Sequence, residues 1–178
     1  MRVVAVAGRR VDALGAEPSR FPARNIALVE QAVSQLLGDL VAEAVVTSAA
    51  NGADLICAKW AMQHEVSLHV VLPFDVDEFK RRSVTDRPGD WGALYDRAIE
   101  YARQRGTLHL LGAQTDDESA AYLRANSAIL DEAAGDGNEP HALIVWDGNE
   151  REHNDFTVAF ADEAKRRGIP VRAVMTNL

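Results

Sequence analysis

The stretch AVVTSAANGADLICAKWA (residues 44–61) passes from a short apolar run, through a turn of small and polar residues, into a helical pattern. The run 44–47 has the length and composition of a buried strand. Apolar side chains then recur from Leu55 to Ala61 as on a packed helix. A strand that leads through a short turn into a helix is the repeating unit of parallel α/β sheets, so this stretch predicts that architecture.

The same unit recurs along the whole chain. Strands are predicted at 3–7, 44–47, 68–72, 107–111, 142–146 and 171–175, with helices at 26–40, 55–61, 75–83, 90–105, 116–134 and 155–167. Such alternation predicts parallel strands joined by right-handed crossovers. We therefore expect an α/β fold, a Rossmann-like three-layer sandwich with a mostly parallel sheet and helices on both faces. The length of 178 residues and the lack of a linker predict a single domain, residues 1–178.

Composition narrows the class of partner. The formal net charge is −8 and no basic run is present, which argues against long DNA or RNA as a ligand. A local basic pocket for one phosphorylated molecule is compatible with that charge. The single cysteine, Cys57, falls in an apolar helix and is expected to be a buried structural thiol in a reducing compartment. No apolar run approaches the ~20 residues that span a bilayer. These features predict a cytoplasmic protein with no membrane partner.

Ligands of open parallel sheets bind beyond the carboxyl ends of the strands, at the point where the strand order reverses. The loop Ser48–Asp54 is the strongest such signal, because its small side chains would let a phosphate approach the amides at a helix start. Ser48 and Asn51 could add hydrogen bonds. The alternative is an ordinary turn in which Gly52 serves backbone geometry alone. The Gly-Lys-Ser/Thr of a P-loop is absent, which argues against ATP hydrolysis of that kind.

Two further strand ends carry charged residues. Arg9 and Arg10 follow the first strand, where a guanidinium could grip a phosphate with two hydrogen bonds; the alternative is a pair of solvated arginines. Asp147, beside Gly148, could accept hydrogen bonds from ribose hydroxyls or cap a turn. We predict that Arg9→Ala or Asn51→Ala weakens ligand binding and leaves the fold intact.

The helices predicted after residue 115 carry two further polar residues that could contact a ligand. Asn126 lies on the inward face of its helix, where it would contact a ligand or make a structural hydrogen bond. Thr157, with Asn154 and Asp155, would cap the last helix, face the ligand, or do both.

Motifs for metal and hydrolase chemistry are missing. The five histidines do not cluster along the sequence, and no HxxxH or CxxC spacing occurs, so neither a metal nor a cofactor is predicted. No Gly-x-Ser-x-Gly elbow is present.

A set of short motifs follows one another in a characteristic order: GRRVD (8–12), RFP (20–22), SAANGADL (48–55), HVVLPF (69–74), YLRAN (122–126) and LIVWDG (143–148). In order and spacing they resemble the SLOG superfamily, named for the SMF/DprA and LOG proteins. The resemblance implies a Rossmann-like domain that binds nucleotides or nucleotide derivatives, in several members as a sensor. Strand ends and resemblance together predict these ligand-binding residues: Gly8, Arg9, Arg10, Ser48, Asn51, Gly52, Ala53, Asp54, Pro73, Asn126, Asp147, Gly148 and Thr157.

One branch of the superfamily, the LOG phosphoribohydrolases, cleaves the N-glycosidic bond of nucleoside monophosphates. Its signature is Pro-Gly-Gly-x-Gly-Thr-x-x-Glu. If Thr157 matches the motif threonine, Phe160 stands at the glutamate position, and the glycine run is missing. An apolar ring can neither move a proton nor stabilise an oxocarbenium ion.

We therefore expect binding or sensing of a nucleotide-derived molecule (ADP-ribose-like, a cyclic nucleotide or a nucleoside phosphate) without turnover. The alternative is an N-glycosidase with a displaced carboxylate, such as Asp155, Asp162 or Glu163. A DprA-like loader of single-stranded DNA is disfavoured by acidity and few aromatic residues. The resemblance also implies a homodimer, to which helix 90–105 could offer an apolar face, and a separate effector protein.

Overall fold

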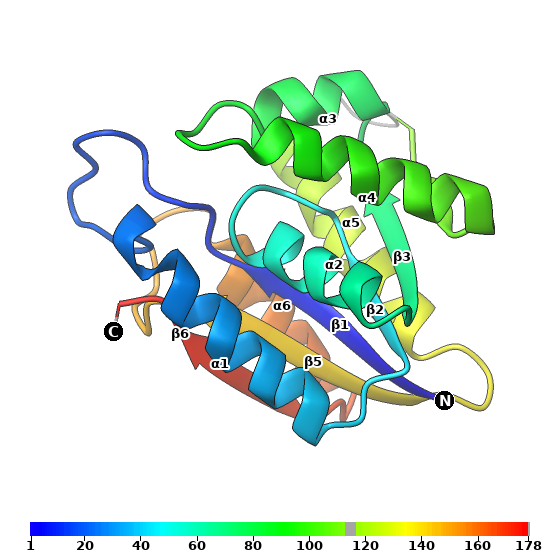
Figure 1. Ribbon diagram of the computed structural model, residues 1–178. Helices are drawn as coiled ribbons and strands as arrows, with labels where there is room; N and C mark the ends of the chain where they lie inside the picture. Colours follow the sequence, from blue (N-terminus) through cyan, green and yellow to red (C-terminus); the bar gives the residue numbers. More distant parts are fainter. Residues whose placement is uncertain (113–116, 178) are drawn as a thin grey trace.

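Six parallel strands form one sheet in the order β4-β3-β2-β1-β5-β6 (Figure 1). The computed structural model describes residues 1–112 and 117–177. The strands are β1 (Arg2–Gly8), β2 (Ala44–Thr47), β3 (Ser67–Leu72), β4 (Leu108–Leu110), β5 (Glu139–Trp146) and β6 (Val171–Met175). The helices are η1 (Ala23–Asn25), α1 (Ile26–Asp39), α2 (Ala53–Gln63), α3 (Val76–Ser83), α4 (Trp91–Arg105), α5 (Glu118–Ala133) and α6 (Phe156–Arg166). The predicted α/β class and its alternation of elements are confirmed.

Most predicted boundaries agree with the structure to within about two residues. β5 is the main difference, because it begins at Glu139, opposite Arg2 of β1, rather than at Ala142. Asp90 precedes α4 as predicted, yet its carboxylate accepts no capping hydrogen bond. The predicted first residue of α5, Asp116, lies outside the described residues.

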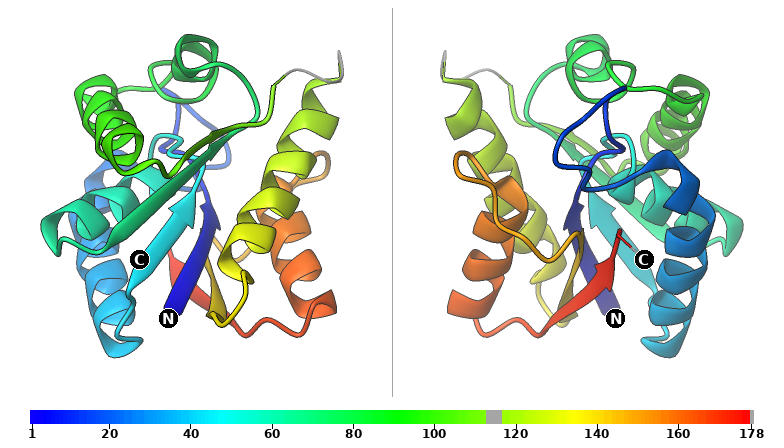
Figure 2. Two further views of the ribbon diagram at one scale, coloured as in Figure 1. Left: turned by 90° about the vertical axis from the view of Figure 1, so that its right-hand side faces the viewer. Right: turned by 90° about the vertical axis from the view of Figure 1, so that its left-hand side faces the viewer.

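Helices cover both faces of the sheet, which gives three layers (Figure 2). Successive side chains of a strand point to opposite faces of the sheet, so the core has two parts. In β1, Val4 and Val6 face α1, α2 and α4, whereas Val3 and Ala5 face α5 and α6. Cys57 is buried in the first of these two cores, as predicted. None of the helices in the described ranges is both long and apolar enough to cross a membrane.

The strand order reverses beside β1. From β1 the chain builds outward through β2, β3 and β4, and then returns through α5 to place β5 on the other side of β1. Such a reversal separates the loops that follow the two central strands and leaves a crevice at their carboxyl ends. The fold therefore directs the loops after β1, β2 and β5 to one edge of the sheet.

Candidate ligand pocket at the strand ends

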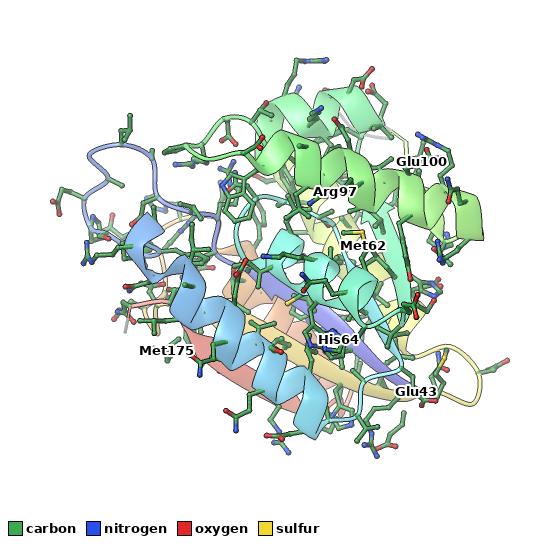
Figure 3. The ribbon with its side chains drawn as sticks, viewed as in Figure 1. Glu43, Met62, His64, Arg97, Glu100 and Met175 are labelled. Carbon is green, nitrogen blue, oxygen red and sulfur yellow. The ribbon has the colours of Figure 1, made fainter. Side chains whose placement is uncertain are left out.

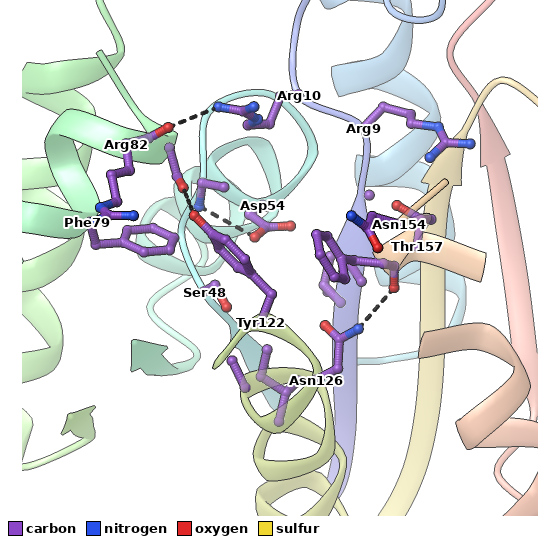
Figure 4. A pocket seen from close by; sticks show the side chains of 18 of the residues that line it. Arg9, Arg10, Ser48, Asp54, Phe79, Arg82, Tyr122, Asn126, Asn154 and Thr157 are labelled. Atoms are coloured by element: carbon purple, nitrogen blue, oxygen red, sulfur yellow. Dashed lines mark hydrogen bonds between the residues drawn. The ribbon is translucent and has the colours of Figure 1, made fainter. Parts of the chain in front are cut away.

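A cavity of about 330 Å³ lies at this edge (Figure 4). Its walls come from the end of β1, the loop between β2 and α2, the second half of α3, the first half of α5 and the loop before α6. Among the predicted ligand-binding residues, those that line it are Gly8, Arg9, Arg10, Ser48, Asp54, Asn126 and Thr157. Those outside its lining are Asn51, Gly52, Ala53, Pro73, Asp147 and Gly148.

The turn before α2 is closed beneath the end of β1. A Cβ added to Gly8 would lie 2.4 Å from the Cβ of Ala53, and one added to Gly52 would lie 2.7 Å from the carbonyl oxygen of Arg9. Gly52 also has a φ of +82°, which side chains rarely adopt. Both glycines thus permit close backbone packing, and for Gly52 this is the geometric role that the sequence left open.

Four amides of this turn are already bonded, whereas the sequence led us to expect them to be free for an anion. Ala49 N donates to Thr47 Oγ1, Ala50 N to Asp54 Oδ2, Asn51 N to Ser83 O and Ala53 N to Arg9 O. The last two of these bonds arise because α3 and the residue after β1 pack onto the turn, and the first two form within residues 47–54. These four amides are therefore used within the fold and do not face an anion.

Asn51 ties three segments together instead of facing the cavity. Its Oδ1 accepts a hydrogen bond from Val11 N at 3.1 Å, and its Nδ2 donates to Ser83 O and Val84 O at 3.2 Å. The side chain is buried, so its hydrogen-bonding capacity is used within the fold. Its loss is expected to destabilise the protein, which corrects the expectation of an intact fold.

The Arg9 side chain lies at the pocket, donates four hydrogen bonds and is 2% exposed. Its Nε donates to Asp147 Oδ1 at 2.8 Å, while Nη1 and Nη2 donate to the two carboxylate oxygens of Asp155 at 2.7 and 2.8 Å. Nη2 also reaches Asn149 O at 2.7 Å, and Arg20 bonds the second oxygen of Asp147 at 2.8 Å. Figure 4 shows the guanidinium turned away from the centre of the pocket.

The hydrogen bonds of this buried network lower the pKa values of its two carboxyl groups. Burial raises the pKa of both Asp147 and Asp155, but hydrogen bonds and charge from Arg9 outweigh it, so each pKa lies below its usual value. Asp155 also caps α6 by accepting hydrogen bonds from Thr157 N and Val158 N. The Arg9 guanidinium therefore holds the loop after β5 in place rather than presenting its charge to a ligand.

Arg151 is a pocket residue that the sequence analysis missed. It is exposed at the rim, and within the described residues its guanidinium has no hydrogen-bond or ion-pair partner. Desolvation, and then the charge of Arg9, lower its pKa below the ordinary arginine value; the Asp155 carboxylate opposes this shift, and Arg20 and Arg10 add to it. By contrast, Arg10 pairs with Asp86, and Arg82 pairs with Glu78 and Glu118. In the sequence Arg151 stands between two glutamates, at 150 and 152, and this pattern did not indicate that it would differ from Arg10 and Arg82 in its ion pairing.

Aromatic side chains also contribute to the pocket walls. The rings of Tyr122 and Phe156 lie 5.2 Å apart, and Phe74 meets Tyr122 edge-on at 5.6 Å. Asn126 Nδ2 donates to Phe156 O at 2.8 Å, which fixes the start of α6 against α5. Its Oδ1 accepts no hydrogen bond in the part of the chain that the structure covers. Asn126 therefore makes the structural bond and also lines the pocket.

Asp54 lines the pocket, and the pKa of its carboxyl group is raised. Desolvation raises its pKa to about 7, against hydrogen bonds from Ala50 N and Thr47. A carboxyl that titrates near neutrality inside a cavity has the property of a general acid or base. Of the carboxylates considered from sequence, Asp155 is bound to Arg9, and Asp162 and Glu163 lie outside the pocket lining. Phe160, at the glutamate position of the LOG motif, is fully buried in the core.

Two histidines come together, in contrast to the expectation that the histidines do not cluster. His69 and His109 lie on neighbouring strands with ring centroids 6.2 Å apart, and Glu132 of α5 lies beside both. The sequence separation of 40 residues hid this proximity, because it arises from strand pairing.

The fold defines a Rossmann-type α/β domain. The chain is similar to the X-ray structure of DNA processing protein A (DprA) from Streptococcus pneumoniae, with a TM-score of 0.56 and 15% sequence identity. The match covers 97% of this chain and 49% of that chain, so this chain spans about half the length of that protein. No family model matches the sequence, and no curated protein matches it. The likeness shows the fold, in agreement with the DprA part of the predicted resemblance.

Proposed function

We propose that the pocket binds a nucleotide or nucleotide-derived small molecule, with a phosphate at Arg151. The observation that carries this proposal is that the Arg151 guanidinium lines a cavity and has no hydrogen-bond or ion-pair partner within residues 1–112 and 117–177. Arg9, Arg10 and Arg20 lie close enough to lower its pKa, so an anion bound there would relieve repulsion and gain charge-assisted hydrogen bonds. A phosphate is the anion that suits a guanidinium fork best.

The remaining pocket walls suit the other parts of a nucleotide. Tyr122 and Phe156 offer ring surface for a base, whose flat face stacks on aromatic side chains. Ser48 and the Oδ1 of Asn126 lie between the strand ends and α5, where they would meet ribose hydroxyls. A cavity of about 330 Å³ is at the small end of the ligand-site range, roughly 300–1,000 Å³, which favours a mononucleotide over longer derivatives.

Isothermal titration calorimetry tests this proposal with AMP as the first probe. Adenosine and inorganic phosphate serve as its two halves, and ADP-ribose and cyclic AMP report on size and phosphate geometry. We expect AMP to bind in a one-to-one ratio and more tightly than either half. A ligand present at 100 times its dissociation constant should also stabilise the fold by about 2.7 kcal/mol.

Arg151→Gln is the diagnostic variant, and Arg97→Gln is its control. Arg97 is exposed on α4, outside the pocket lining (Figure 3). Loss of a charge-assisted hydrogen bond of about 1.5–3 kcal/mol should weaken AMP binding roughly tenfold or more in Arg151→Gln. Arg97→Gln should leave it unchanged. Equal affinity in both variants, or no binding by the wild-type chain to any of the nucleotides, would overturn the proposal.

A second candidate function rests on Asp54. Its raised pKa and its place in the pocket favour an N-glycosidase in which Asp54, rather than the carboxylates considered from sequence, protonates the departing base. Water would add to the sugar carbon as the carbon–nitrogen bond breaks and would return its proton to the Asp54 carboxylate, so the products are free base and a ribose phosphate.

Chromatography of nucleoside monophosphates incubated with the protein separates the two functions. Steady release of free base that disappears in Asp54→Asn, with AMP affinity retained, would favour the enzyme. Absence of release from the wild-type chain leaves the binding function alone. Release that persists in Asp54→Asn would reject the role given to this carboxyl.

A further inference from the structure

A second polar cluster lies on the face of the sheet that α5 covers. It consists of His69 in β3, His109 in the edge strand β4 and Glu132 near the end of α5. The three side chains are partly buried, with exposed fractions of 19%, 39% and 33%. None of them lines the nucleotide pocket. The cluster is therefore independent of the function proposed above.

The strand register brings the two histidines onto one face. His109 pairs with Val71, two residues after His69, so both imidazoles project from the same side of the sheet. Their rings lie nearly parallel, at 15°. Glu132 then closes the group from α5, so two strands and a helix each contribute one side chain.

The distances suit a metal ion of tetrahedral preference. One nitrogen from each histidine and one oxygen of Glu132 all lie within 4.8 Å of one another. His69 Nδ1 is 2.7 Å and His109 Nε2 is 3.7 Å from Glu132 Oε1. Ligands about 2.0–2.1 Å from a Zn²⁺ ion stand roughly 3.3 Å apart in a tetrahedron, which falls between these two distances.

His109 Nε2 provides an independent sign that a partner belongs here. This atom is shielded from solvent and has no hydrogen-bond partner among the described residues. Its 3.7 Å separation from Glu132 Oε1 is beyond hydrogen-bond range. A buried ring nitrogen without a partner is unfavourable, and a metal ion between the three groups would satisfy it.

His69 is also oriented as metal ligands usually are. Its Nε2 lies 3.0 Å from Ser67 Oγ, which fixes the ring and leaves Nδ1 facing the cluster. Histidine ligands commonly make such a hydrogen bond through their second nitrogen.

We propose that His69, His109 and Glu132 bind one divalent transition-metal ion of the Zn²⁺ class. Two imidazoles and a carboxylate are a ligand set that Zn²⁺ accepts, with a fourth position open to water. The ion would fasten the edge strand β4 and β3 to α5, whose first half forms a wall of the nucleotide pocket.

Zinc uptake by metal-free protein tests the proposal, with Zn²⁺ alone as the titrant in calorimetry. Elemental analysis after dialysis gives the stoichiometry, which we expect to be one ion per chain. His109→Gln and Glu132→Gln should each weaken Zn²⁺ binding at least tenfold. His141→Gln is the matched control, because His141 also lies beside a glutamate, Glu139, at 3.3 Å. It should bind Zn²⁺ as the wild type does.

Cobalt substitution provides a readout that does not depend on destabilising variants. A Co²⁺ ion in a tetrahedral nitrogen and oxygen site has intense visible absorption, and the wild-type chain should show it at one equivalent. No saturable Zn²⁺ uptake by the wild-type chain would overturn the proposal. So would a folded His109→Gln variant that retains both wild-type affinity and the Co²⁺ spectrum.

Discussion

Two arginines at the same edge of the sheet differ in burial and in hydrogen bonding. Arg9 is buried and donates to two carboxylates and a carbonyl, whereas Arg151 is exposed at the pocket rim and has no partner among the described residues. Both belong to strand-end loops, the region where α/β sheets bind ligands. The sequence drew attention to Arg9, because it directly follows β1, and not to Arg151.

The difference shows that position at a strand end does not by itself mark a ligand-binding arginine. A guanidinium has five N–H donors, and what matters is whether the fold supplies their acceptors. For Arg9 it does, through Asp147 and Asp155, so the charge serves the fold. For Arg151 the part of the fold that the structure describes supplies none, which is why we propose this charge as the one that meets a ligand.

The largest expected effect is that of Arg9→Met. Removing the cation leaves the buried Asp155 carboxylate without its ion-pair partner and leaves Asp147 with Arg20 alone, and breaking a buried ion pair costs about 3–5 kcal/mol. We expect a loss near the upper end of that range in urea unfolding.

Arg10→Met is the control for Arg9→Met. The ion pair of Arg10 with Asp86 is partly exposed, so its loss should cost less than about 1 kcal/mol. Similar stabilities for the two variants would show that Arg9 and Arg10 do not differ as described.

The next effect concerns Asp54 and pH. Its folded-state pKa of about 7 lies above the unfolded value of about 3.9, so the folded state binds the proton more tightly. Stability should therefore fall as pH rises from about 4 to about 7 and then level off. Asp54→Asn should remove this component, which amounts to about 4 kcal/mol.

Urea unfolding of both proteins at pH 5 and pH 8 measures the Asp54 effect. The advantage of Asp54→Asn over wild type should be larger at pH 8. A difference between the two proteins that does not change with pH would contradict the burial of this carboxyl.

Gly52→Ala tests the closed turn directly. The new methyl group would meet the carbonyl oxygen of Arg9 at 2.7 Å in a backbone conformation that alanine avoids, at a cost of about 3 kcal/mol. Gly38→Ala, in the last turn of α1 with open space around it, should instead stabilise by up to about 1 kcal/mol. Thermal unfolding of the two variants should therefore shift in opposite directions; a Gly52→Ala variant as stable as wild type would mean that the turn is open.

The smallest effect on stability is expected for Arg151→Gln. An exposed side chain without a partner contributes little to the fold, so its replacement should change the free energy of unfolding by less than about 0.5 kcal/mol. Chemical denaturation measures this. A loss above about 1 kcal/mol would show that Arg151, like Arg9, serves the fold.

Local sequence pattern was sufficient to predict the fold. Short apolar runs such as residues 3–6 and Ala44–Thr47 are buried on both faces, and the sequence shows the turn of small residues before α2 directly. The start of β5 was not predictable, because residues 139–141 are polar or proline and become a strand only by pairing with β1.

The site was less predictable than the fold, for a physical reason. Whether Arg9 is free depends on Asp147 and Asp155, which lie about 140 residues away in sequence. The proximity of His69 to His109 likewise depends on strand register. Such contacts leave no periodicity and no motif in a single sequence.

The central claim is that ligand phosphate meets Arg151 while Arg9 keeps its carboxylates. A crystal structure of the chain with AMP tests it most directly. We predict phosphate oxygens within hydrogen-bond distance of the Arg151 guanidinium, with Arg9 still bound to Asp147 and Asp155. Phosphate bound to Arg9 with those carboxylates displaced, or AMP bound outside the pocket, would contradict it.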